Sequence, residues 1–503
     1  MSELFSNLAL GFSVAGTLNN LFFCFVGAML GTLIGVLPGI GPLATLAMLL
    51  PITFQLPPEG ALIMLAGIFY GAQYGGSTTS ILINVPGESS SVVTALDGHA
   101  MAKQGRAGSA LAIAAIGSFF AGCVATVLIA VAGPPLASIA QKFGAAEYFS
   151  LMVFGLVGAV VLASGSVIKA VSMIILGLLL GLVGLDVTSG QGRFTFGIPE
   201  LSDGIGFVTV SLGLFGIAEI VTNLERASKH GRDEIAPVHS LMPTRQDMRE
   251  SWPAILRGTF VGSLLGILPG GGAVLASFSA YTLEKKVAKD PSRFGKGAIE
   301  GVAGPESANN AAAQTSFIPM LTLGIPSNAV MALMIGAMMI QGITPGPQVM
   351  TKQPALFWGI VASMWIGNLM LVIINLPLVG MWIRLLRVPY EMLFPAIIVF
   401  CSIGIYSLNN STTDVLFTAG FGLIGYLFVK LGFEAAPLLL GFVLGPLMEE
   451  NLRRAMTISR GDPMTFIDRP ISLGLLVASL ALLAIVIAPS VRRTREAAFQ
   501  EEG

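Results

Sequence analysis

The chain has 503 residues, of which 54% are hydrophobic and only 11% are charged, and its mean hydropathy is +0.81. Water-soluble globular proteins carry about 25% charged residues, so this composition excludes a soluble fold and indicates a membrane protein. The formal net charge of -1 provides no broad basic surface, and we therefore expect no nucleic-acid partner.

Apolar runs follow one another along the whole chain and are long enough to cross a bilayer, alone or with an interruption. Because one span takes about 20 apolar residues, the runs predict an all-α polytopic membrane protein with about 12 transmembrane helices. Many of the 61 glycines and 28 prolines lie inside the runs, which predicts broken or re-entrant helices. The runs lie near residues 20–37, 43–54, 60–74, 109–133, 148–163, 167–185, 205–222, 254–282, 317–342, 356–379, 391–407, 413–431, 433–447 and 471–489.

An internal repeat relates the two parts of the chain. Residues 31–41 (GTLIGVLPGIG) and 262–272 (GSLLGILPGGG) match at a constant offset of 231, and further matches occur at an offset of 237. The latter pair Gly60-Ala61 with Gly297-Ala298 and Gln104-Gly105 with Gln341-Gly342. We therefore predict two homologous halves. The predicted division is a first transmembrane repeat, a cytoplasmic linker, a second transmembrane repeat and a C-terminal tail, at residues 1–222, 223–253, 254–489 and 490–503.

Basic residues gather in two polar stretches, at 226–249 and 285–296, whereas none occurs before Lys103. By the positive-inside rule both stretches are cytoplasmic, and the N-terminus lies outside. The N-terminus also lacks the basic region of a cleaved signal peptide, so we expect the first span to be retained. If one half starts outside and the other starts inside, the repeats are inverted, as in many secondary transporters whose sites lie at the repeat interface.

Each half contains a Leu-Pro-Gly-x-Gly segment within an apolar run, preceded by a Gly-x-x-x-Gly pattern that favours close helix packing. A proline with two glycines ends one helix and lets another begin. The new N-terminus then offers unpaired N–H groups and the positive end of a dipole, which favour a carboxylate. A purely structural kink is the alternative. The substrate-binding candidates in these segments are Pro38, Gly39, Gly41, Gly270 and Gly272.

A string of polar residues follows each segment, at 74–91 and at 304–328. Hydroxyls, amides and exposed backbone can bind carboxylate oxygens, and their oxygens also suit Na⁺. Neither string contains Lys or Arg, so a bound anion would depend on helix N-termini and neutral donors. The candidates for contact with substrate or Na⁺ are Ser77, Thr78, Thr79, Ser80, Asn84, Asn309, Asn310, Gln314, Thr315, Ser316 and Ser327.

Glu88 and Glu306 leave two interpretations open. An ionisable group at membrane depth is costly and usually functional, which predicts cation coupling through Na⁺ or a proton. Alternatively, each is a first-turn glutamate near the surface, stabilised by a helix dipole. Asp97 and the nearby His99, Lys103 and Arg106 are interpreted as an interfacial loop.

Several chemistries have no motif in this sequence. Residues 268–272 lack the lysine of a P-loop, and neither HExxH nor GxSxG occurs. The three cysteines lie far apart in apolar runs and are interpreted as packing residues. We therefore expect no enzyme, no organic cofactor and no transition-metal site, but only Na⁺ or H⁺ as a coupling ion.

These motifs resemble the TctA family, the large membrane subunit of tripartite tricarboxylate transporters, over essentially the whole chain. The resemblance rests on residues 35–41 (GVLPGIG), 74–88 (YGGSTTSILINVPGE), 266–272 (GILPGGG), 304–310 (GPESANN) and 324–326 (GIP). It implies a multi-pass permease of the bacterial inner membrane, driven by an ion gradient, that imports citrate or related carboxylates. It also implies two partners, a small four-span TctB-like subunit and a periplasmic TctC-like solute-binding protein. A passive anion channel or a permease without a binding protein is the alternative.

Overall fold

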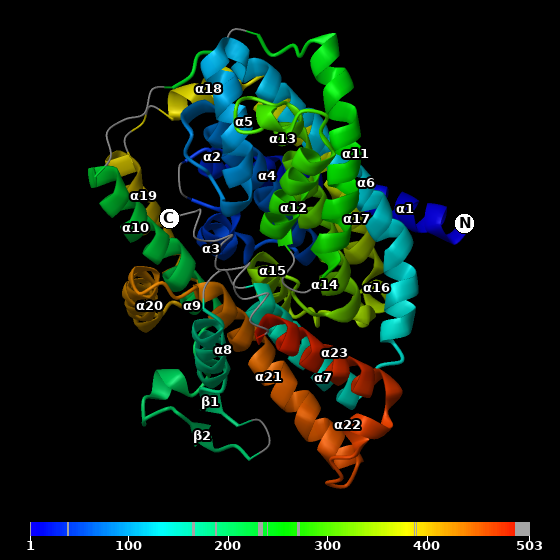
Figure 1. The fold of residues 1–503 in the computed structure, drawn as a ribbon. Coiled ribbons are helices and arrows are strands. Elements are labelled where there is room, and N and C mark those ends of the chain that lie inside the picture. Colours follow the sequence, from blue (N-terminus) through cyan, green and yellow to red (C-terminus); the bar gives the residue numbers. More distant parts are fainter. Residues whose placement is uncertain are drawn as a thin grey trace.

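The computed structural model describes residues 2–37, 40–162, 166–186, 189–229, 235–238, 240–268, 272–386, 388 and 390–487. Within these residues the chain is almost entirely helical, with one short antiparallel hairpin of β1 (Gly184–Leu185) and β2 (Gly192–Arg193). Figure 1 shows α5, α18 and the start of α11 at one end of the molecule, and the β-hairpin with α22 at the other. The predicted all-α class is confirmed.

The first part of the chain contains ten α-helices in the described residues. They are α1 (Ser2–Ala15), α2 (Leu18–Gly35), α3 (Pro42–Thr53), α4 (Pro58–Ile83), α5 (Val92–Met101), α6 (Ala107–Ala140), α7 (Ala145–Leu162), α8 (Val167–Gly181), α9 (Phe207–Ser211) and α10 (Ala218–Lys229). Short turns of other helix types join them, namely η1 (Ser89–Ser91), η2 (Ala102–Arg106), η3 (Pro199–Leu201) and η4 (Leu212–Ile217).

The second part begins with α11 and ends with α23. Its helices are α11 (Arg245–Ile267), α12 (Gly272–Val287), α13 (Glu300–Thr315), α14 (Phe317–Leu323), α15 (Ala329–Ile340), α16 (Pro347–Lys352), α17 (Pro354–Asn375), α18 (Val379–Leu385), α19 (Tyr390–Asn409), α20 (Thr412–Lys430), α21 (Ala435–Ile458), α22 (Thr465–Asp468) and α23 (Pro470–Ile487), with η5 (Pro291–Arg293) before α13.

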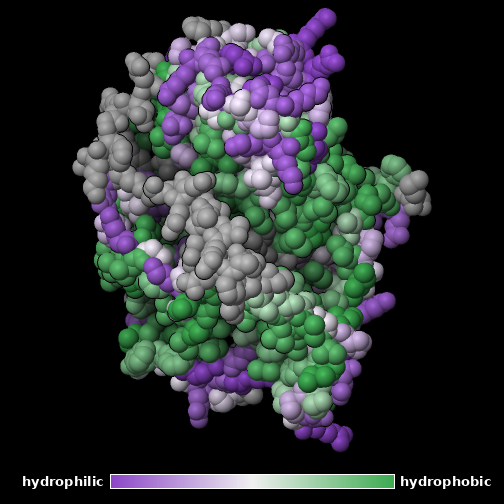
Figure 2. Space-filling model, viewed as in Figure 1, coloured by the Kyte–Doolittle hydropathy of each residue, from purple (hydrophilic) through white to green (hydrophobic). Residues whose placement is uncertain are grey.

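Six helices in the described residues are long and apolar enough to cross a membrane, and several shorter apolar helices accompany them. Figure 2 shows hydrophobic residues across the middle of this face and hydrophilic residues gathered toward its two ends. Such a band indicates a multi-pass membrane protein. The six helices are Leu18–Gly35, Ser89–Ala140, Phe207–Glu225, Pro354–Asn375, Met392–Asn409 and Thr412–Lys430.

The polar strings differ from the sequence interpretation, because both are largely helical and buried. Residues 77–80 continue α4, and α13 is buried from Gly301 to Thr315 although it carries Glu, Asn and Gln side chains. In α4 the hydroxyls of Ser77 and Ser80 lie within 3.1 Å of the carbonyl oxygens four residues earlier. Hydropathy did not indicate α13, since a helix surrounded by protein needs no apolar surface toward lipid.

The Gly-x-x-x-Gly patterns form glycine ridges on α2 and α11, and these ridges pack closely against the buried helices α4 and α13. A Cβ on Gly31 of α2 would overlap the Ile68 carbonyl of α4, and a Cβ on Gly262 of α11 would overlap the Ala308 carbonyl of α13. The ridges therefore act as close-packing surfaces, as predicted. Ile68 and Ala308, which these glycines contact, are 240 positions apart. Helix α4 therefore corresponds to α13 and α14 at an offset of 240, and not at the offset of 237 taken from the sequence matches. The first half contains three additional residues, those of η1, between α4 and α5, and no such turn lies in the described residues between α14 and α15. From α5 onward the offset between the halves is therefore 237.

Each half packs a glutamine against a loop of the other half. Gln104 Nε2 donates to the Lys296 carbonyl (2.8 Å), before α13. Gln341 Nε2 donates to the Thr53 carbonyl (3.2 Å) and the Leu56 carbonyl (3.3 Å), before α4. The two segments thus exchange equivalent contacts across the molecule.

The predicted interfacial loop around Asp97 is wrong, because these residues lie on α5 and η2. The Asp97 side chain is fully buried. Its Oδ1 accepts from the backbone N–H groups of Gly297 and Ala298, both at 2.8 Å, and its Oδ2 accepts from the Tyr281 hydroxyl at 2.9 Å. Asp97 therefore joins α5 to the second half.

Helices extend into both ends of the predicted linker. α10 ends at Lys229, and α11 begins at Arg245, where Thr244 and Asp247 form a reciprocal capping box. Between them, Ala236 N–H donates to the Leu82 carbonyl near the end of α4. The predicted tail, residues 490–503, lies outside the described residues.

Candidate functional site

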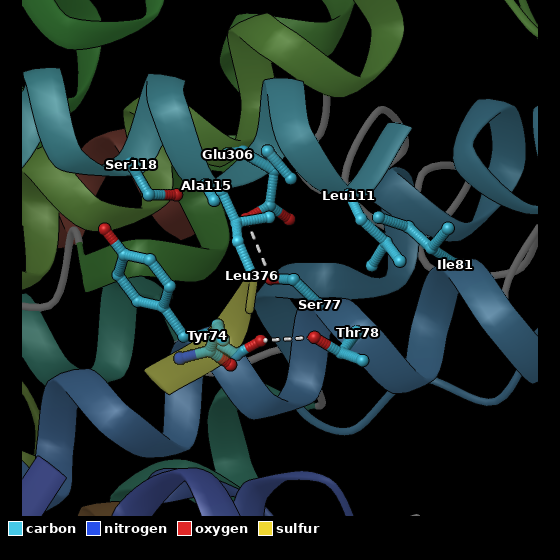
Figure 3. A pocket seen from close by; sticks show the side chains of 11 residues that line it. Tyr74, Ser77, Thr78, Ile81, Leu111, Ala115, Ser118, Glu306 and Leu376 are labelled. Atoms are coloured by element: carbon cyan, nitrogen blue, oxygen red, sulfur yellow. Dashed lines mark hydrogen bonds between the residues drawn. The ribbon is translucent and has the colours of Figure 1, made fainter. Parts of the chain in front are cut away.

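A small cavity of about 20 Å³ lies between α4, α6, α13 and α17 (Figure 3). It combines a polar wall with an apolar one, and no Lys, Arg or His is among the described residues that line it. The polar wall consists of Tyr74, Ser77, Thr78, Ser118, Glu306 and Asn375. The apolar wall consists of Ile81, Leu111, Ala114, Ala115 and Leu376.

Glu306 lies in this wall and is held by the first half. Its side chain is 1% exposed. Ser77 Oγ of α4 donates to its Oε2 at 2.7 Å, and Thr94 Oγ1 of α5 donates to its Oε1 at 2.5 Å. Figure 3 shows this hydrogen bond between Ser77 and Glu306 in the cavity wall. The carboxylate of Glu306, which belongs to the second half, therefore accepts hydrogen bonds from two hydroxyls of the first half.

Glu88 shows the reverse arrangement. Its side chain is 7% exposed, and its Oε1 accepts from Ser90 Oγ (2.6 Å) and from Asn309 Nδ2 of α13 (2.9 Å). Among the described residues, neither Glu88 nor Glu306 forms an ion pair with a basic side chain. The interpretation as a surface first-turn glutamate is wrong for Glu306, which lies buried within α13. Glu88 does lie at a helix start, as the cap of η1, but it is buried rather than at the surface. Cation coupling stays a prediction.

Both Leu-Pro-Gly-x-Gly segments interrupt a helix. α2 ends at Gly35 and α3 begins at Pro42, which occupies the first helical position. α11 ends at Ile267, and α12 begins at Gly272. Pro38, Gly39 and Gly270 lie outside the described residues.

The residues at the two helix restarts face different side chains. A Cβ on Gly41 would lie 3.9 Å from the Glu88 Cβ, whereas a Cβ on Gly272 would lie 3.8 Å from the Asn328 Cβ. The start of α3 thus has an acid of the protein itself as its neighbour, and the start of α12 has an amide.

Several other candidates brace the backbone around the site. Thr79 Oγ1 donates to the Val36 carbonyl (2.7 Å) just after α2, which satisfies a carbonyl freed by the interruption. Ser80 Oγ donates to Ser91 Oγ (2.8 Å). Thr315 and Ser316 donate to carbonyls of their own helix, and Ser327 Oγ donates to the Ser316 carbonyl (3.4 Å).

Asn84 does not join the cluster. It is exposed and ends α4 in the left-handed conformation, with a φ of 57°. Gly324 ends α14 in the same way, with a φ of 74°. Apart from glycine, asparagine is one of the few residues that adopt the left-handed conformation readily. The role of Asn84 is therefore to end α4.

A buried polar stripe extends the site along α13. Glu306, Asn310 and Gln314 recur every four residues and therefore share one helix face. Asn310 Nδ2 donates to Ser118 Oγ of α6 (2.7 Å). Thr126 Oγ1, also of α6, donates to Gln314 Oε1 (2.6 Å). The stripe joins α13 to the long helix of the other half.

The sequence interpretation omitted several residues of this site. They are Tyr74, Thr94, Ser118, Thr126 and Asn375. Ser118 and Thr126 lie eight residues apart in an apolar run, and this helical spacing of polar residues was the available signal. Asn375 ends α17 and has no comparable pattern around it.

One family model and two relatives from Agrobacterium vitis match this chain. A model described as the tripartite tricarboxylate transporter TctA family matches residues 21–440. An uncharacterized 52.8 kDa protein in the TAR-I ttuC′ 3′ region of Agrobacterium vitis is 61% identical over 502 residues, covering 100% of both chains. An uncharacterized protein in the TAR-II ttuC′ 3′ region of that organism is 63% identical over 241 residues, or 48% of this chain and 100% of that protein. No solved structure matches the chain.

Proposed function

We propose, from the premise that this chain belongs to the tripartite tricarboxylate transporter TctA family, that it is the large permease subunit of a binding-protein-dependent secondary transporter. It imports tricarboxylates or related, citrate-like carboxylates and uses a Na⁺ or H⁺ gradient. Its place is the bacterial inner membrane. Its partners are a small four-span TctB-like subunit and a periplasmic TctC-like solute-binding protein.

The observation that carries this proposal is the pair of interleaved acids. Glu306 lies in the cavity wall with only neutral partners, and Glu88 is held across the halves by Asn309. A carboxylate that enters beside a charged Glu306 is repelled. Two like charges about 4 Å apart repel by roughly 4 kcal/mol at an effective dielectric constant of about 20. A proton or Na⁺ on Glu306 removes this repulsion, so ion binding and substrate binding favour each other.

The exchanged contacts support alternating access by inverted repeats. Gln104 binds the loop before α13 and Gln341 binds the loop before α4, so each half holds the other at an equivalent position. Movement of one part of each repeat against a fixed scaffold would open the cavity to one side and close it to the other. In this scheme, the backbone at the two helix interruptions changes conformation during the movement.

A passive anion channel is the second candidate, since it would also use interrupted helices and a polar lining. It requires no coupling between an ion and the substrate. The acid in the cavity wall favours the coupled transporter, because a channel for anions gains nothing from a buried carboxyl there.

The test is uptake into proteoliposomes that contain this chain with its candidate partners. Labelled citrate and a panel of small carboxylates are offered under separately imposed Na⁺ and proton gradients. Accumulation that needs one gradient and the binding protein supports the proposal and names the ion. Equilibration without a gradient contradicts it in favour of a channel, and no movement of any carboxylate in folded protein contradicts the cargo.

A further inference from the structure

Exposed basic side chains gather where α11 begins and α12 ends. Two of them lie on α11 and three lie at the end of α12, and none forms an ion pair within the described part of the chain. We call these residues the basic cluster: Arg245, Arg249, Lys285, Lys286 and Lys289.

Two ion pairs hold these helix ends together. Arg257 of α11 donates to both carboxylate oxygens of the buried Glu284 of α12, at 2.8 and 2.5 Å. Arg293, just after α12, donates to Glu250 of α11 at 2.9 Å. The three lysines lie between Glu284 and Arg293 in the chain, so the two pairs place them beside the first turns of α11.

The acids around the basic cluster have other partners. Glu284 and Glu250 belong to the two ion pairs, and the buried Asp247 binds Arg106 at 2.6 Å. Asp290 accepts from the hydroxyl of Ser292 at 2.7 Å and forms no ion pair with the cluster in the described residues. The surface therefore keeps an excess of positive charge, which attracts anions.

The basic face of α11 continues into an apolar surface. Its exposed residues recur every three or four positions and so share one helix face: Arg245, Arg249, Trp252, Leu256 and Phe260. The side chains of Leu256 and Phe260 are 54% and 66% exposed. Figure 2 shows hydrophilic residues at this end of the molecule and hydrophobic residues directly below them. Cations, a tryptophan and then apolar side chains are the order expected where a helix enters a bilayer.

The outer face of α12 shows the same order in the opposite chain direction. Val274 and Leu275, near its start, are 40% and 37% exposed, and the three lysines follow at its end. The two helices together present cations at one level and apolar side chains below that level. A molecule with a negatively charged headgroup and acyl chains is complementary to both parts.

We propose that the start of α11 and the end of α12 form a binding site for an anionic phospholipid. The headgroup phosphate contacts the basic cluster, and the acyl chains lie along Leu256 and Phe260. The positive-inside rule predicts that this end faces the cytoplasmic leaflet. Each basic residue near the surface favours an anionic lipid by roughly fivefold. This inference does not depend on the transported cargo.

The experiment measures quenching of Trp252 fluorescence by brominated lipids around the full chain in nanodiscs. Brominated phosphatidylglycerol is compared with brominated phosphatidylcholine at increasing mole fractions. Trp252 is 39% exposed and packs edge-on against Phe120, with ring centroids 5.3 Å apart, so it reports on lipid beside the cluster. Trp252→Phe gives the signal of the other three tryptophans, which is subtracted.

Two double variants of equal charge change are compared. Arg249→Gln with Lys286→Gln removes charge from the basic cluster, and Lys142→Gln with Lys352→Gln removes two exposed lysines elsewhere. We expect wild type and the second variant to prefer phosphatidylglycerol about tenfold or more, and the first variant about twofold or less. High salt should lower the wild-type preference, because exposed charges are screened.

Folding is checked separately. Thermal unfolding of each variant reports whether it folds, and Arg249→Lys with Lys286→Arg keeps both charges and should keep the preference.

Three outcomes overturn the inference, and none of them bears on transport. The first is equal quenching of Trp252 by the two lipids in wild type, including no quenching by either. The second is an unchanged preference in Arg249→Gln with Lys286→Gln. The third is displacement of the brominated lipid by free glycerol phosphate, which would indicate a site for soluble phosphates and not for a lipid.

Discussion

The two halves place different side chains on nearly the same backbone. Glu88 has φ −147° and ψ 163°, and Asn328 has φ −155° and ψ 175°. Each caps the helix that follows it and lies beside the glycine at a helix restart. The repeated fold thus fixes the geometry, while the choice of acid or amide differs between the halves.

The second acid breaks the symmetry further. At the offset of 240 set by the glycine ridges, Glu306 of α13 corresponds to Ala66 of α4. Each half therefore supplies one buried acid, from positions that are not equivalent. The two halves therefore share their packing but differ in where they carry a buried acid.

The largest expected effect comes from Glu306→Gln, which removes the charge and keeps the size. Gradient-driven accumulation falls by about 100-fold, whereas exchange of substrate across the membrane at equal concentrations persists. Uptake and counterflow in proteoliposomes measure both. Glu300→Gln in the first turn of α13, an acid that pairs with Arg293 and does not line the cavity, is the matched control and retains accumulation. Equal loss of counterflow in Glu306→Gln would contradict a coupling role.

Glu88→Asn makes the first restart resemble the second. The asparagine can cap η1 as Asn328 caps α15, so we expect the protein to fold. Accumulation falls by about tenfold, because the acid held by Asn309 is lost. The dependence of uptake on the imposed ion gradient measures this change, and an unchanged dependence would assign Glu88 a structural role only.

Gly262→Ala tests the close packing of α11 on α13. The added Cβ overlaps the Ala308 carbonyl, so the helices must separate at a cost of about 1–3 kcal/mol. Gly420→Ala in α20 meets open space and should raise helix stability slightly, which makes it the control. Thermal unfolding of the purified protein measures both, and a higher midpoint for Gly262→Ala would refute the packing argument.

The smallest effect compares the two exchanged glutamines. Gln341→Ala removes donation to carbonyls before α4 and should cost about 1 kcal/mol of unfolding free energy. Gln104→Ala removes one bond at an exposed position and should cost less. Thermal unfolding of the two variants side by side checks the order. A reversed order would show that burial does not govern these contacts.

Local patterns in the sequence determined much of the fold. Apolar runs located most of the helices, since hydropathy is a property of consecutive residues; the run at 356–379, for example, corresponds to α17. The Pro-Gly segments predicted both helix interruptions, because these residues act on their own backbone. The repeat also indicated which positions of the two halves to compare, although insertion of η1 shifted its register.

Only the tertiary structure decided how the site is composed. Ser77 and Glu306 are 229 positions apart, and Glu88 and Asn309 are 221 apart, so no local pattern joins them. The polar helix α13 is buried because other helices surround it, and hydropathy cannot report that environment. Whether the Tyr74 hydroxyl and the Asn375 oxygen are paired or free likewise depends on neighbours brought together by packing. Sequence determines which groups are present, and the fold decides which of them meet.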